Sequence, residues 1–515
     1  MRLNRLRGCL LASCVLAMAA VGVTSCAVGP NYHTPEAHVP DHYSAVQTPT
    51  GANSVDFVNW WRSLQDPELD SLVDRAIKAN PNLQIALDRV QAARAFEAGI
   101  IGTVLPYAEG SAGAGWGTGS DLTRGRVAQS LISADNTAGL KHINAIAGFD
   151  AVWELDVFGK YRREIEAARY DTQAVAAARN AVLVSVVADV ARAYVDLRGL
   201  QVRASVLHAS IDVLRESLRI VNIRYERGIT NELDVTLATR ELNVLEAQVA
   251  PVDAEVSAAQ YTIATLLGQY PEDLVQELTP KAMIPTVPAA VQSGLPLDLL
   301  RRRADIREAE RELAGATARI GVATANLFPQ IAVTGAVGLQ QQTLGTIPSV
   351  SKHIWSAGPS VFWPLLDFGA LDAEVEVADY QTRALLVNYK ATIQNAVKEV
   401  DTAWTAYSAQ QESLTKLGAA LVASQRAVTL ANERYERGLT DFLNVVDAER
   451  QEYDIEEQYT AAQVVAAEQF IALYRSLGGG WENYQALPPI HRPEPAIIAV
   501  FQRVLSSNNP LQESP

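Results

Sequence analysis

The sequence predicts a mixed α and β fold that is internally duplicated, with very long coiled-coil helices joined to strands suited to a membrane. Three observations support this prediction. The segment Arg224-Tyr225-Glu226-Arg227-Gly228 recurs as Arg434-Tyr435-Glu436-Arg437-Gly438. Apolar residues keep a 3.5-residue period over unusually long stretches, which is typical of coiled coils. Four further segments alternate between apolar and polar residues, as strands do.

The amino-terminal residues resemble a bacterial secretory signal. Arg2, Arg5 and Arg7 precede a short apolar run that ends at Val23. The next residues, Thr24-Ser25-Cys26, complete a resemblance to the lipobox of lipoproteins. We therefore expect residues 1–25 to be removed and Cys26 to carry lipid; the alternative is an ordinary cleavage site with an incidental cysteine. Processing would leave one lipidated cysteine and no disulfide within the chain.

The charge balance and hydropathy narrow the class of protein. The chain has 43 Lys+Arg against 58 Asp+Glu, a net charge of -15, which argues against nucleic acid as a partner. After Cys26 no stretch of 18 consecutive residues is apolar, so no transmembrane helix is expected. If the chain crosses a membrane, it must do so as strands.

Constant spacings define two repeats. A spacing of 210 residues separates Trp153 from Trp363 and the two Arg-Tyr-Glu-Arg-Gly segments, while upstream landmarks such as Pro106 and Pro329 are 223 residues apart. The expected organisation has six parts: a signal peptide (1–25), a lipidated amino-terminal segment (26–65), a first repeat (66–268), a linker (269–297), a second repeat (298–481) and a carboxyl-terminal tail (482–515).

Each repeat contains one long helix, which in the first repeat runs from about Lys160 to Tyr225. About 65 residues at ~1.5 Å each make a rod of roughly 100 Å. Gly228 and Gly438 stand where a helix favours a left-handed residue after its end. Shorter antiparallel helices are expected to follow at 235–267 and 445–477. We expect helix 305–327 to stack on the first of these and helix 82–102 on the second.

Four strands are expected, near 103–119, 145–158, 328–342 and 355–367. In the second of them Phe149 and Trp153 share one face while Asp150 and Glu154 share the other, which suits a barrel with a wet interior and a lipid exterior. The alternative is the edge of a soluble sandwich. Four strands cannot close a barrel; two copies would give eight strands with a filled interior, and three would give twelve with a bore. A conduit therefore favours a trimer.

Four short motifs are specific: Trp60-Trp61, Gly294-Leu295-Pro296, Phe328-Pro329 and Leu477-Gly478-Gly479-Gly480-Trp481. With these motifs the chain resembles the TolC-like outer-membrane factors, specifically the NodT-type lipoprotein branch of tripartite efflux systems. Ala304 stands where relatives usually carry proline. The resemblance implies a lipid-anchored homotrimer in the outer membrane, with a twelve-stranded β-barrel and a coiled-coil helical barrel in the periplasm. A periplasmic adaptor and an inner-membrane transporter of the resistance-nodulation-division (RND) type would complete the pump.

The resemblance also places functional residues at the periplasmic tip. The repeated turns would dock the adaptor, through five residues: Arg224, Tyr225, Gly228, Arg434 and Gly438. Asp447 matches an acidic gate position, Asp234 is expected in the equivalent ring of the first repeat, and Tyr435 looks like a tethering residue. Asn444 stands where some relatives carry a second aspartate. The alternative for Asp447 is a solvated carboxylate on an exposed helix face.

Catalysis and cofactor binding have no support in the sequence. No HExxH, CxxC, P-loop or nucleophile-elbow motif is present, so an enzyme is not expected. His33, His38 and His42 could suggest a metal site, but a flexible polar tether after the lipid anchor is the preferred interpretation. The expected function is passive conduction of small toxic compounds out of the periplasm. A conduit for secreted polypeptides, as in type I secretion, and a coiled-coil scaffold of the envelope remain as alternatives.

Overall fold

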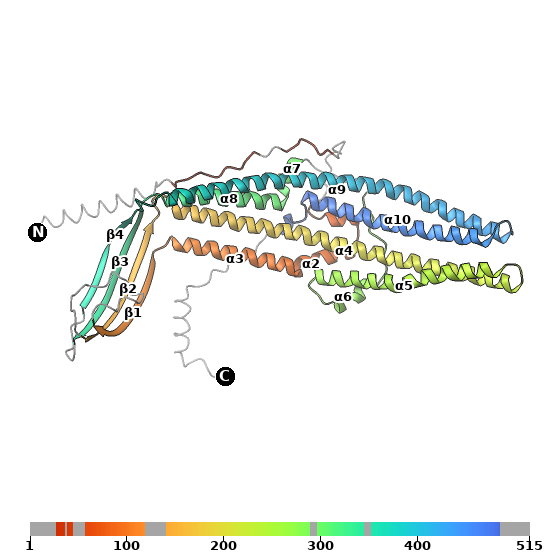
Figure 1. The fold of residues 1–515 in the computed structure, drawn as a ribbon, viewed down its shortest axis with the longest axis horizontal. Helices are drawn as coiled ribbons and strands as arrows, with labels where there is room; N and C mark the ends of the chain where they lie inside the picture. Colours follow the sequence, from red (N-terminus) through yellow and green to blue (C-terminus); the bar gives the residue numbers. More distant parts are fainter. Residues whose placement is uncertain are drawn as a thin grey trace.

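The protein is a long rod of helices with one antiparallel sheet at an end (Figure 1). The computed structural model describes residues 27–36, 39–44, 57–118, 141–288, 296–344 and 352–484. The expected signal peptide, the lipidation residue Cys26 and most of the carboxyl-terminal tail lie outside these residues.

Two helices of 67 residues each run through the rod: α4 (Lys160–Glu226) and α9 (Ala370–Glu436). At ~1.5 Å per residue each is roughly 100 Å long, which confirms the predicted rods. Leu183, Val190 and Leu197 of α4 are fully buried and seven residues apart, as a coiled-coil seam requires. One stretch of α4 has a mean hydropathy of 1.6 and is long enough to cross a membrane, but 56% of it is buried, as in the core helix of a bundle.

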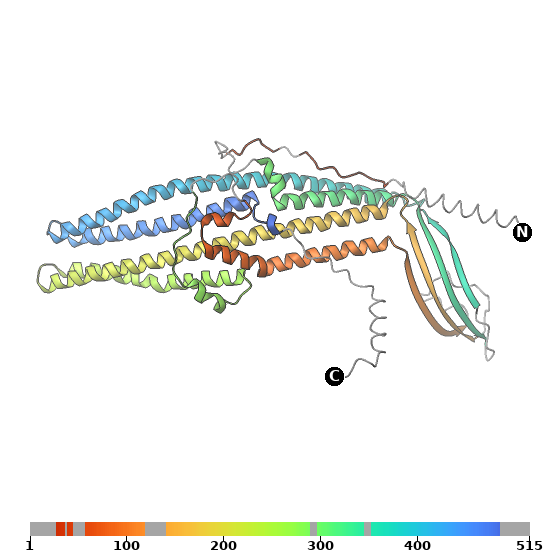
Figure 2. The same ribbon diagram turned by 180° about the vertical axis from the view of Figure 1, so that it is seen from behind.

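Four shorter helices complete the wall of the rod: α3 (Pro81–Thr103), α5 (Glu232–Leu266), α8 (Ala304–Ala325) and α10 (Phe442–Leu477). Helices α3 and α5 pack along one side of α4, whereas α8 and α10 lie between α4 and α9 (Figure 2). The wall is therefore four helices wide, and α9 forms one of its edges.

The short helices stack within a repeat, so the expected stacking between repeats is wrong. Asn80 caps α3 and its Nδ2 donates to the carbonyl of Leu266 at the end of α5, at 2.7 Å. At the corresponding place in the second repeat, Arg303 precedes α8 and donates to the carbonyl of Ser476 at 2.8 Å. Both pairings give the same total length, so length could not decide between them. The deciding contacts are made by the residue before each helix.

Short helices form a collar around the middle of the rod: η2 (Trp60–Leu64), α2 (Pro67–Ala79), α6 (Pro271–Leu278), α7 (Pro296–Arg302) and η5 (Glu482–Tyr484). Its core holds the tryptophans that the resemblance singled out. Trp60 stacks on Tyr474 at 5.7 Å, and Trp481 donates its indole N–H to the carbonyl of Arg302 at 2.8 Å. Because Trp60 and Trp481 come from opposite ends of the chain, the collar joins the two repeats.

The sheet has the order β1-β2-β3-β4, with β1 (Tyr107–Thr118), β2 (Lys141–Leu155), β3 (Gln330–Leu344) and β4 (Lys352–Phe362). The four predicted strands are confirmed. Phe149 pairs with Val337, which pairs with Trp355, so these exposed apolar side chains share one face. Asp150 pairs with Glu109 on the other face. One face is therefore apolar and the other acidic, as expected.

The amino-terminal segment lies against the rod, so the expected flexible tether is wrong for its described part. Arg163 donates to the carbonyl of Val28 at 3.1 Å and to the side chain of Asn31 at 2.8 Å. Tyr32 donates to Glu310 at 3.2 Å, and Tyr43 is buried. These side-chain contacts hold the segment to the helical wall between the sheet and the collar.

Candidate functional site

Two hairpin turns form the end of the rod that lies away from the sheet (Figure 1). Gly228 and Gly438 have the same φ of +70°. The N–H groups of Ile229 and Leu439 each reach back 2.9 Å to the carbonyls of Arg224 and Arg434. This bonding closes a helix end with a left-handed residue, a conformation that glycine adopts without strain. The role predicted for these two glycines at the helix ends is confirmed.

The residues after the two turns also correspond. Thr230 is hydrogen-bonded to Asp234, and Asn444 donates to Thr440 at 2.8 Å. Asp234 and Asn444 thus occupy equivalent positions at the 210-residue spacing.

Asp447 has a different counterpart in the first repeat. At the same spacing of 210 residues its equivalent is Leu237, which lies one helical turn after Asp234 in the sequence. Asp234 and Asp447 are therefore not equivalent positions of the two repeats, and the acidic rings expected at the tip stay a prediction. Asp447 lies further into α10 than Asn444 and is exposed.

The two turn tyrosines have different surroundings. Tyr435 is 8% exposed, with the Arg224 guanidinium 4.4 Å above its ring and Phe442 at 5.3 Å. Burial raises the pKa of Tyr435; the nearby Arg224 charge opposes this shift and Asp234 adds to it. Tyr225 is 45% exposed. The structure thus brings Arg224, Tyr435 and Asp234 together, and leaves Tyr225 on the surface.

Two apolar clusters lie in the half of the rod between the collar and the hairpin turns. The tip cluster lies next to the turns and consists of Val221, Ala238, Tyr435, Phe442, Val445 and Val446. The shaft cluster lies nearer the collar and consists of Ala204, Leu207, Ile211, Leu214, Leu245, Val252 and Tyr453. Both clusters join the first repeat to the second, so the two hairpins pack as one unit.

Two buried glutamates, Glu241 and Glu449, separate these clusters and form what we call the acidic layer. On α5, Glu241 lies between Ala238 of the tip cluster and Leu245 of the shaft cluster. On α10, Glu449 lies between Val446 of the tip cluster and Tyr453 of the shaft cluster. Ser217 donates to Oε1 of Glu449 at 3.0 Å, while Oε2 has no hydrogen-bond partner among the described residues.

Glu449 is only 9% exposed. Burial raises the pKa of Glu449 to about 7; the hydrogen bond from Ser217 opposes the shift and the charge of Glu452 increases it. An ionised carboxylate is costly in such a place because it is removed from water. Sequence reasoning missed this residue. The available signal was a glutamate at helical spacing from Val445, Val446 and Tyr453.

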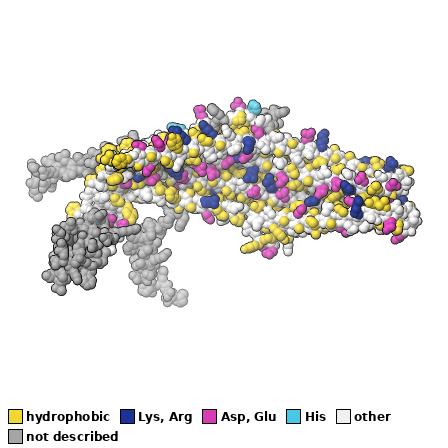
Figure 3. All heavy atoms as spheres, in the orientation of Figure 1, with side chains coloured by type: hydrophobic (Ala, Val, Ile, Leu, Met, Phe, Trp, Pro, Cys, Tyr) yellow, Lys and Arg dark blue, Asp and Glu magenta, His cyan; other side chains and the backbone are white. Residues whose placement is uncertain are grey.

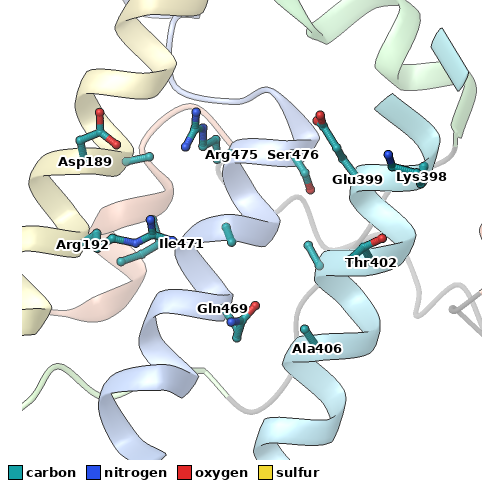
Figure 4. A pocket seen from close by; sticks show the side chains of 13 residues that line it. Asp189, Arg192, Lys398, Glu399, Thr402, Ala406, Gln469, Ile471, Arg475 and Ser476 are labelled. Carbon is teal, nitrogen blue, oxygen red and sulfur yellow. The ribbon is translucent and has the colours of Figure 1, made fainter. Parts of the chain in front are cut away.

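A groove of about 420 Å³ lies between α4, α9 and α10. Figure 4 shows charged side chains of both signs around it, including Asp189, Arg192, Lys398, Glu399 and Arg475. Acidic and basic side chains are also interspersed along the outside of the helices (Figure 3). Mixed charge of this kind suits a hydrated surface. Within the described ranges no three His, Cys, Asp or Glu residues are placed to hold a metal ion.

Comparisons with known proteins agree with this architecture. The family described as outer membrane efflux protein matches residues 72–269 and 295–479. Nodulation protein T of Rhizobium leguminosarum bv. viciae is 30% identical over 495 residues, which is 95% of this chain and 97% of that protein. The toluene efflux pump outer membrane protein TtgF of Pseudomonas putida is 27% identical over 484 residues, 91% of this chain and 97% of that protein.

Solved structures give the same result. The outer-membrane channel OprN has a TM-score of 0.79 and 34% identity, and the match covers 88% of this chain and all of that chain (100%). The open state of the MtrE outer membrane channel of Neisseria gonorrhoeae has a TM-score of 0.75 and 27% identity, covering 90% of this chain and 100% of that chain. A two-repeat helical rod with an apolar-faced sheet, matched over nearly its whole length, establishes that this chain belongs to the outer membrane efflux protein family.

Proposed function

We propose that three copies of this chain form a passive exit duct through the outer membrane for small toxic compounds, and that no chemistry is performed on the cargo. The observation that supports this most directly is the sheet. Its apolar face is exposed, which suits lipid, and its outer strands β1 and β4 each have a neighbour on one side only.

The strand edges require other copies. Backbone N–H and C=O groups within a bilayer must be hydrogen-bonded, so β1 and β4 need partners. Two chains would close an eight-stranded barrel filled by side chains, whereas three give twelve strands and a bore. The helical wall supports the same assembly, because apolar side chains are exposed along it: Ile85, Phe96, Val244, Tyr261, Val377, Tyr380, Val387 and Val422.

The other parts of the pump follow from the relatives. We assign the hairpin turns, with Arg224, Tyr225, Gly228, Arg434 and Gly438, to docking of a periplasmic adaptor that connects to an RND transporter in the inner membrane. Asp447 is assigned to an acidic ring that narrows the tip, with Asp234, Tyr435 and Asn444 around it. Three carboxylates around one axis would repel each other and favour cations.

We also assign lipidation to Cys26. Its neighbour Ala27 lies against Gly159, where β2 leads into α4. The two backbones are so close that a Cβ added at Gly159 would lie 2.6 Å from the Ala27 Cα. A lipid attached at this level would enter the leaflet that borders the periplasm. Replacement by Cys26→Ser should release the chain from lipid attachment without removing the barrel. Metabolic labelling with palmitate would detect the loss.

Two measurements test the duct. Purified protein in a planar bilayer should give stable conductance steps, and cells without the gene should become sensitive to organic solvents and small antibiotics while their secreted proteins are unchanged. Loss of a secreted polypeptide with normal drug sensitivity would favour the secretion alternative. A soluble monomer that never conducts would refute the duct.

A further inference from the structure

Contacts inside one repeat recur at the equivalent residues of the other. Trp153 donates to the carbonyl of Val104 at 3.0 Å, and Trp363 donates to the carbonyl of Leu327 at 3.1 Å. The joints made by Asn80 and Arg303 repeat in the same way. Because sequence spacing and contacts agree, the two repeats are equivalent units placed side by side.

Contacts between the repeats, in contrast, have no second copy among the residues that the structure describes. At the sheet end, Phe158 before α4 stacks on Phe328 before β3, with ring centres 4.7 Å apart. At the tip, Arg224 of the first repeat lies over Tyr435 of the second. In each case one edge of the first repeat, which carries Phe158 and Arg224, packs on the edge of the second repeat that carries Phe328 and Tyr435. The opposite pair of sides remains open in a single chain.

The residues equivalent to these contacts are exposed. Phe368 corresponds to Phe158 and is 97% exposed, and Leu105 corresponds to Phe328 and is 65% exposed. At the tip, Arg434 and Tyr225 correspond to Arg224 and Tyr435, and both lie on the surface. An almost fully exposed phenylalanine beside a helix start is a strong indication of a missing neighbour. Phe368 also has a φ of +55°, an uncommon conformation for a residue with a side chain.

We propose that neighbouring subunits join by repeating these two internal contacts: Phe368 packs on Leu105 of the partner subunit, and Arg434 stacks on Tyr225 of the partner subunit. The inference rests on the proposed trimer and specifies how it closes. The first contact lies where β4 would pair with β1 of the partner subunit. The second lies at the tip, where an arginine over an aromatic ring gains a cation–π attraction.

Thiol cross-linking tests the sheet-end contact. The native cysteines, Cys9, Cys14 and Cys26, all precede residue 27, so none in the described part competes with an introduced pair. A chain with Leu105→Cys and Phe368→Cys, treated in membranes with a short bifunctional thiol reagent, should give covalent dimers and trimers. The matched pair Phe158→Cys with Phe328→Cys should link within one chain and leave the mass on a denaturing gel at that of a monomer. Phe328→Cys with Phe368→Cys should not link.

The outcomes separate the inference from the duct itself. If native mass measurement finds trimers but the 105/368 pair stays unlinked, or if the 328/368 pair links instead, the proposed contact is wrong and the duct stands. If no trimer exists under native conditions, both fail.

A double-mutant cycle tests the tip contact independently, and still does so if the cysteine chains fold poorly. Arg434→Ala and Tyr225→Ala should each lower the temperature at which trimers dissociate in detergent, and the double variant should lower it no further than one of them does. Arg224→Ala with Tyr225→Ala, which are not partners, should be additive. Additive loss for the 434/225 pair would overturn the tip contact.

Discussion

The two hairpin tips carry the same five residues and the same glycine geometry, yet within a single chain their tyrosines have different surroundings. In the second turn Tyr435 is buried under Arg224, whereas in the first turn Tyr225 faces solvent. The backbone of each turn is set locally by glycine and by the carbonyls behind it. The surroundings of each tyrosine are set by the helix alongside. Identical local sequence therefore fixes the shape of a turn but not the burial of its side chains within one chain.

Replacing each turn tyrosine by alanine should give the largest difference in stability between the two hairpins. Tyr435→Ala should destabilise the tip by ~3–5 kcal/mol, because a buried aromatic ring and its contacts are lost. Tyr225→Ala in dissociated chains should cause a loss of about 1 kcal/mol, since nearly half of that side chain is already exposed. Hydrogen exchange of the tip amides measures both. Equal losses in dissociated chains would contradict the difference in burial.

Glu449 gives the second hairpin a pH dependence, and its equivalent in the first hairpin, Thr239, has no carboxyl group. The pKa in the folded tip, about 7, exceeds the ordinary value of 4.5. Between these two pH values the Glu449 carboxyl group is therefore mostly protonated in the folded tip and mostly ionised in the opened tip. Packing of the acidic layer should weaken as pH rises from about 4.5 to 7 and then stay weak.

Glu449→Gln should remove that dependence. At pH 8 the substitution should stabilise the tip by roughly 3 kcal/mol, and at pH 4 it should have little effect. Hydrogen exchange across this pH range, corrected for intrinsic rates, is the measurement. Glu433→Gln on the exposed face of α9 serves as the matched control and should leave the profile unchanged. A control profile that shifts equally would assign the effect to overall charge.

Valine at the two turn glycines should affect both hairpins alike. An added Cβ meets no atom within 4 Å at Gly228 or Gly438, so only the strained φ of +70° matters. Gly228→Val and Gly438→Val should each destabilise their turn by ~1–3 kcal/mol. Gly102→Ala, at a position that is equally open but has no positive φ, is the control. Trimer yield and thermal dissociation would show the effect, and normal behaviour of either valine variant would count against the turn geometry.

Asp447 should have the smallest effect on stability and a distinct effect on permeation. Its side chain is exposed, so Asp447→Ala should change stability by less than ~0.5 kcal/mol. If the carboxylates narrow the tip, the variant should raise conductance and uptake of large antibiotics. Asp234→Asn gives the first turn the amide of Asn444 and should preserve the turn. Any change in conductance of this variant would then report the lost negative charge alone. Unchanged leak in Asp447→Ala would remove that residue from the gate.

Much of the architecture could be predicted from the sequence because it depends on periodicity. A seven-residue apolar repeat specifies a rod whatever lies beside it, alternation specifies a two-faced strand, and glycine permits a turn at Gly228 and Gly438. The extent of α4 and the existence of the four strands were therefore accessible, whereas the strand ends differ from the expected ones by a few residues. The resemblance added the family and the tip, but it placed Asp234 and Asp447 in equivalent positions, which the hydrogen bonds of Thr230 and Thr440 do not support.

Amino-acid pattern alone determined the lengths of the helices, the duplication and the faces of the strands, since these are properties of neighbours along the chain. Only the tertiary structure decided that α3 stacks on α5, that Glu449 is buried and that Tyr435 differs from Tyr225. Each of these depends on which side chains arrive from another helix. Burial and its electrostatic consequences are properties of that packing, and identical segments can therefore differ in both.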